Sequence, residues 1–143
     1  MRSYTVEEIG VKEFMQHLFV LDTFVEFEMR GVTIHSFTHF EISGEGDDGF
    51  CTWEEIRPYV RHIIKGRDKP RAMKIIFARA SPETLHPNAA ALFINIAYDG
   101  EKINITTAGS QKNFELSKSM DIEWDNWVAD FLAEKGMASL RLE

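Results

Sequence analysis

Hydrophobic side chains recur every three to four residues in three stretches of the chain, the spacing expected of helices with one buried face. The first stretch predicts a helix over residues 9–19, and the last predicts a helix over 122–135. Between them, Thr52 and Glu55 have the spacing of a capping box, so another helix is expected to begin there. Pro58 lies inside that helix and is expected to kink it or to begin a second segment.

An alternation of hydrophobic and polar residues, typical of strands, fills most of the remaining chain. It predicts strands at residues 3–6, 24–30, 32–42, 73–80 and 113–116. Gly31 interrupts the alternation between the second and third of these strands. A bulge or a sharp bend is expected at that point.

The pair Asp99-Gly100 is the clearest turn signal in the chain. It supplies the positive φ angles of a type I′ turn and predicts a tight hairpin of strands 91–98 and 101–107. With a two-residue loop, four isoleucines share the core face, in the facing pairs Ile96–Ile103 and Ile94–Ile105. The helices and strands together predict an α+β fold, in which an antiparallel sheet of about five to six strands packs against three helices.

The length of 143 residues favours one domain, residues 1–143, with residues 137–143 as a loose tail. Hydrophobic residues make up 44% of the chain and charged residues 27%, an ordinary balance for a globular protein. The one cysteine, Cys51, has no partner for an internal disulfide, which fits a reducing compartment. No signal peptide and no apolar run of about 20 residues is visible, so we expect a cytoplasmic protein without membrane contact.

Short motifs spread over nearly the whole chain carry a family resemblance. They are Trp53-x-x-Ile56-Arg57-Pro58, Ile64-Lys65-Gly66, Lys74-Ile75-Ile76, Leu92-Phe93-Ile94-Asn95-Ile96, Tyr98-Asp99-Gly100 and Trp124-x-x-Trp127. Together they resemble a bacterial family catalogued as domain of unknown function 5721. The resemblance implies a bacterial origin, and it brings no activity and no catalytic residues with it.

The net charge is −7, but positive charge gathers in residues 57–79, where eight basic residues meet one acid. Six of them, which we name the basic stripe, follow one face of the expected middle helix and the loop after it: Arg57, Arg61, Lys65, Arg67, Lys69 and Arg71. Such a stripe predicts contact with an anionic ligand, an acidic protein surface or, without a supporting motif, nucleic acid. The alternative is a solvated face whose charges pair with acids elsewhere.

Four residues are candidates for a catalytic site assembled in space: His35, His39, Glu41 and Cys51. On the predicted strand 32–42, His35 and His39 share a face but lie about 13 Å apart. Two imidazoles at that separation cannot bind one zinc ion, because each nitrogen must lie about 2 Å from the metal. We therefore expect no metal site and no cofactor, and an enzyme remains an alternative to a non-catalytic function.

These observations favour a non-catalytic binding or regulatory module that contacts an anionic partner through the basic stripe. If the stripe binds phosphates, its affinity should fall steeply with salt. A homodimer is a further alternative, formed through the hairpin face that carries Phe93 or through an edge strand of the sheet.

Overall fold

The computed structural model describes residues 2–64, 70–137 and 141–142. Its helices are α1 (Glu8–Phe19), α2 (Trp53–Ile64), the short 3₁₀ helix η1 (Pro82–Thr84) and α3 (Ser119–Glu134). Its strands are β1 (Ser3–Val6), β2 (Glu28–His35), β3 (His39–Ser43), β4 (Glu45–Gly46), β5 (Gly49–Phe50), β6 (Ala72–Ala78), β7 (Ala89–Tyr98), β8 (Ile103–Gln111) and β9 (Arg141–Leu142).

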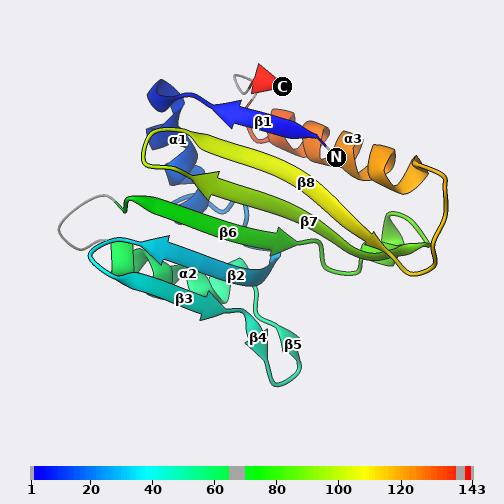
Figure 1. Ribbon diagram of the computed structural model, residues 1–143, viewed down its shortest axis with the longest axis horizontal. Coiled ribbons are helices and arrows are strands. Elements are labelled where there is room, and N and C mark those ends of the chain that lie inside the picture. The colour runs from blue at the N-terminus through cyan, green and yellow to red at the C-terminus, as the bar shows by residue number, and fades with distance from the viewer. Residues whose placement is uncertain (1, 65–69, 138–140, 143) are drawn as a thin grey trace.

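The main sheet is antiparallel throughout, with the strand order β3-β2-β6-β7-β8-β1-β9 (Figure 1). Its last member, β9, is only two residues long, and β4 pairs with β5 in a separate small hairpin. The helices α1, α2 and α3 lie behind the sheet in the view of Figure 1. The predicted α+β fold, with an antiparallel sheet of five to six strands and three helices, is confirmed, and β9 extends that sheet by one short strand.

The core lies between the helices and one face of the sheet. In β7, Leu92, Ile94 and Ile96 are buried, whereas the residues between them are partly exposed. Two tryptophans are fully buried among these strands and helices, and each donates its indole N–H to a backbone carbonyl: Trp53 to Leu18 at 2.7 Å and Trp124 to Phe93 at 2.9 Å. Burying large aromatic rings with their polar atoms paired gains the hydrophobic stabilisation without an unsatisfied donor.

The β7–β8 hairpin forms at the predicted place, but its register differs from the prediction. Tyr98 faces Ile103, so the connection has four residues instead of two. The carboxylate of Asp99 accepts hydrogen bonds from the backbone N–H groups of Glu101 (2.9 Å) and Lys102 (2.7 Å), which stabilises the longer turn. A shift of two residues leaves every side chain on its predicted face, so the isoleucines of both strands remain buried.

Residues 32–42 do not form the single strand that was predicted. The segment is a hairpin, in which β2 and β3 pair antiparallel and His35 lies opposite His39. The turn between them is closed by a hydrogen bond of 2.9 Å from Ser36 N–H to the Thr38 carbonyl. The irregularity expected at Gly31 is present as a register shift between Met29 and Gly31 where β2 pairs with β6.

Several smaller predictions can be compared with the structure. The capping box of Thr52 and Glu55 is present at the start of α2, which continues through Pro58. Residues 113–116 do not form a strand. Of the predicted tail, Met137 is buried and β9 pairs with β1, while residues 138–140 and 143 lie outside the described residues.

Among the described helices, none combines the length and the apolar character needed to cross a bilayer.

Candidate functional site

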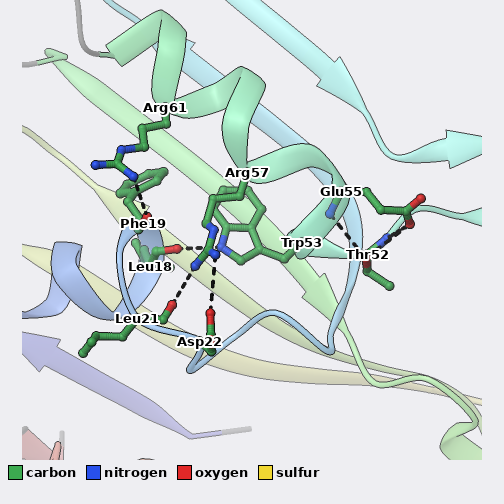
Figure 2. A network of polar contacts seen from close by, with 9 residues as sticks. All are labelled: Leu18, Phe19, Leu21, Asp22, Thr52, Trp53, Glu55, Arg57 and Arg61. Carbon is green, nitrogen blue, oxygen red and sulfur yellow. Dashed lines mark hydrogen bonds and ion pairs between the residues drawn. The ribbon is translucent and has the colours of Figure 1, made fainter.

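Two arginines of the basic stripe contact the end of helix α1 (Figure 2). Arg57 donates a hydrogen bond of 2.6 Å to the carbonyl of Leu21 and pairs with the Asp22 carboxylate at 3.5 Å. Arg61 donates to the carbonyl of Phe19 at 3.5 Å. The last carbonyls of a helix lack partners within it and attract cations, so Arg61 stabilises the end of α1, and Arg57 holds the loop that follows it. Their charges are therefore used, at least in part, inside the chain.

Of the other four members of the basic stripe, only Arg71 is among the described residues. Lys65, Arg67 and Lys69 lie outside the described residues. Arg71 is exposed just before β6, and its backbone N–H donates to the carbonyl of His35 at 2.7 Å. The contacts of the described members therefore give no direct support to the stripe as a continuous anion-binding surface.

The structure brings three of the four enzyme candidates together, against the expectation from sequence. Nδ1 of His39 lies 3.2 Å from Nδ1 of His35, and Nε2 of His39 lies 3.1 Å from Oε1 of Glu41. The expected separation of about 13 Å is wrong, because the intervening residues turn and pair the two histidines across the β2–β3 hairpin.

Cys51 lies apart from this histidine pair. Its backbone carbonyl accepts from the N–H of Met29 at 2.8 Å, near the start of β2, whereas His35 is the last residue of β2. Residues six positions apart on a strand are separated by about 20 Å. In residues 2–64 and 70–137, no group of three or more His, Cys, Asp or Glu side chains is placed to hold a metal ion.

Another histidine, His86, lies within hydrogen-bonding distance of a serine hydroxyl, an arrangement found in enzymes that use a nucleophile and a general base. Nε2 of His86 is 3.1 Å from Oγ of Ser119. However, Nδ1 of the same ring accepts a hydrogen bond of 3.1 Å from the backbone N–H of Asn88. The neutral ring then carries its proton on Nε2 and donates it to Ser119, so it cannot accept the serine proton.

A cleft lies where three segments that are distant in the sequence meet. The loop between α1 and β2 contributes residues 22, 23 and 25–27, and the segment directly after β6 contributes Arg79 and Ala80. The last two turns of α3 form the opposite wall. Its volume is about 570 Å³, within the range of roughly 300–1,000 Å³ that small-molecule sites occupy. The α3 wall consists of Trp127, Phe131, Glu134 and Lys135.

Aromatic rings form one side of this cleft. Trp127 stacks on Phe131 with the ring centroids 5.2 Å apart and the planes 13° from parallel. Phe27 meets both rings edge-on, at 85° to each. Because these rings pack against one another, this side of the cleft is apolar and should need little ordering when a ligand binds.

Arg79 lies across the same wall with unused hydrogen-bonding capacity. Its guanidinium carbon is 4.8 Å from the centre of the Trp127 ring. One terminal nitrogen donates a long hydrogen bond of 3.4 Å to Oγ1 of Thr84, and the buried Nε has no hydrogen-bond partner among the described residues. No ion pair of the described residues joins Arg79 to an acid.

Arg30 shows how a structural arginine differs from Arg79. Its Nε is also buried without a partner, but its guanidinium pairs with Glu28 at 3.2 Å and lies 3.8 Å from the centre of the Phe50 ring. It does not line the cleft. Arg79 thus combines a cleft position, an aromatic support and the lack of a carboxylate partner among the described residues.

A family model described as a family of unknown function, DUF5721, matches residues 13–139. The chain belongs to the DUF5721 family. This confirms the resemblance carried by the tryptophan and hairpin motifs. No curated protein and no solved structure matches the chain.

The cleft of this DUF5721 protein was not predicted from its sequence. Trp127 and Phe131 follow the helical spacing that indicates core packing, and both are in fact only partly buried. In the sequence, Arg79 stands out only as the last basic residue of segment 57–79. The one signal that could have singled it out is its place directly after a strand, beside a long connection, because such positions often carry binding residues.

Proposed function

We propose that this DUF5721 protein is a non-catalytic binding module of the bacterial cytoplasm that holds a small anionic ligand in the cleft between β6 and α3. One observation carries the proposal: the guanidinium of Arg79 lies over Trp127 with a buried Nε that has no hydrogen-bond partner among the described residues. Burial of an unpaired donor is unfavourable and calls for an explanation, such as an ion bound nearby.

An oxyanion is the ligand group that best complements Arg79. A guanidinium presents its N–H donors in a planar fork that matches a carboxylate or a phosphate. The acids of the cleft leave Arg79 unpaired, and one of them, Asp22, pairs with Arg57 instead. Lys135 lines the same cleft and adds a second positive charge close to Phe131.

The aromatic wall supports a ligand that also has a flat apolar part. Trp127 and Phe131 are partly exposed, so an apolar ring can contact their exposed parts while its anionic group reaches Arg79. The proposal therefore keeps the anionic partner expected from the sequence and moves the contact from the basic stripe to the cleft. A cytoplasmic location belongs to the proposal and is supported by the single cysteine.

Calorimetric titration with phenyl phosphate tests the proposal, since this probe joins an aromatic ring to a dianion. We expect phenyl phosphate to bind at least about tenfold more tightly than inorganic phosphate, because only the former uses the aromatic wall. Arg79→Ala should weaken phenyl phosphate binding about 10- to 100-fold, since a hydrogen bond to a charged group is worth roughly 1.5–3 kcal/mol.

Arg71→Ala is the matched control. It also removes one arginine charge, but Arg71 is exposed and precedes β6, whereas Arg79 follows that strand. Its affinity for phenyl phosphate should equal that of the unmodified chain. Equal weakening by both variants would mean that the anion responds only to net charge. That result, or no binding up to about 1 mM, would refute the proposal.

A further inference from the structure

We infer that the tip of the β2–β3 hairpin is a two-histidine binding site for a divalent transition-metal ion of the zinc, nickel and copper group. His35 and His39 lie opposite each other on paired strands, and their Nδ1 atoms are 3.2 Å apart. This site lies at the opposite end of β2 from the cleft, and it does not depend on the proposed function.

The separation of the two nitrogens suits a single bound ion. Imidazole nitrogens lie about 2.0–2.1 Å from zinc, so two ligands at tetrahedral or right angles are separated by about 2.9–3.4 Å. The observed 3.2 Å falls within that interval. The two rings are inclined by 71°, and rotation about their side-chain bonds is needed to direct both lone pairs at one point beside the line that joins the nitrogens.

Glu41 prepares His39 for this role. A carboxylate accepts hydrogen bonds, so the contact of 3.1 Å between Glu41 and Nε2 of His39 places a proton on Nε2. In the neutral ring, Nδ1 then has a free lone pair that faces His35. In metal sites, the ring nitrogen of a histidine that does not bind the metal usually donates a hydrogen bond to a carboxylate or another acceptor. This contact orients the ring and raises its basicity.

The metal replaces the proton that the two Nδ1 atoms share in its absence. When His39 accepts at Nδ1, His35 is the donor, and its ring proton must move to Nε2 for the metal to bind. That move is possible through water because His35 is exposed, as is the side chain of His39, which is 46% accessible. Imidazole is a preferred ligand of all three metals. Water molecules supply the coordination positions that the two histidines leave open.

Titration with zinc sulfate, followed by calorimetry, tests the inference. We expect one ion per chain, and at least a tenfold weaker affinity in His35→Ala and in His39→Ala. Glu41→Gln should weaken zinc binding by about 10-fold without abolishing it, the usual effect of removing such a hydrogen-bond acceptor. All three positions are exposed, so the variants should keep the far-ultraviolet circular dichroism of the unmodified chain.

His62→Ala is the matched control, because His62 is an exposed histidine on α2. It should bind zinc as tightly as the unmodified chain. Three results overturn the inference: no zinc binding by the unmodified chain, unchanged affinity in both hairpin variants, or an equal loss in His62→Ala. Failure of the phenyl phosphate experiment leaves this result unaffected, because the two tests use different probes and different residues.

Discussion

Arg57 donates a hydrogen bond of 2.6 Å to the carbonyl of Leu21, a residue 36 positions earlier in the chain (Figure 2). The same helix provides Trp53 and Arg61, which bind the carbonyls of Leu18 and Phe19. Side chains spaced by four residues on α2 therefore donate to three carbonyls in the last turn of α1 and the loop after it. The contacts of Arg57 and Arg61 thus join two helices, and anion binding by the basic stripe stays a prediction.

Arg57→Ala should lower the free energy of unfolding by about 1.5–3 kcal/mol, the usual value of a hydrogen bond from a charged donor. The Arg57 side chain is only 17% accessible, so water replaces the lost contact poorly. Urea unfolding measures the change. Arg71→Ala, which removes an exposed arginine, should stay within about 0.5 kcal/mol of the unmodified chain. Equal effects of the two variants would contradict a structural role of Arg57.

Gly44 follows β3 at a point where the chain passes very close to Met29. A Cβ atom at Gly44 would lie 1.5 Å from the backbone oxygen of Met29, so the backbone would have to move. We expect Gly44→Ala to destabilise the protein by about 3 kcal/mol or more. At Gly31 the nearest atom to a new Cβ would be 3.8 Å away, so Gly31→Ala should have little effect. Thermal unfolding of the two variants should separate them clearly, and similar midpoints would be inconsistent with this close approach.

Acid should weaken the turn at Asp99. Hydrogen bonds from the backbone N–H groups of Lys102 and Glu101 hold the pKa of Asp99 below its ordinary value of 3.8. A carboxylate with a lowered pKa in the folded state adds stability above its unfolded pKa, and that stability is lost as the pH falls through the folded pKa. Asp99→Asn should therefore show a smaller loss of unfolding free energy between about pH 5 and pH 3 than the unmodified chain. An identical loss in both proteins would contradict the assignment.

The β7–β8 hairpin shows what local sequence could predict. The Asp99-Gly100 pair located the turn, and the alternation of isoleucines identified the buried face. The register was wrong by two residues, because the side chain of Asp99 binds Glu101 and Lys102 N–H groups and stabilises a four-residue turn. The faces were still correct, since side chains repeat every two residues along a strand.

The histidine pair shows where the same reasoning failed. Ser36, Phe37 and Thr38 include no glycine, proline or asparagine, and the serine alone is too weak a signal to mark a turn within residues 32–42. The cleft could not be predicted either, because its walls come from the loop between α1 and β2, from Arg79–Ala80 and from α3. Likewise, the spacing of Arg57 and Arg61 showed that they share a face of α2. It could not show that this face meets the end of α1.

The signal of the Arg79 Nε–H group in a ¹H–¹⁵N spectrum gives the most direct test of the proposed ligand site. Arg30 serves as an internal reference, because its Nε is also buried without a hydrogen-bond partner but lies outside the cleft. Addition of phenyl phosphate should move the Arg79 signal, because the anion binds the terminal nitrogens of the same guanidinium, while the Arg30 signal stays in place. An Arg79 signal that does not move at saturating phenyl phosphate, or an equal movement of both signals, would contradict the account.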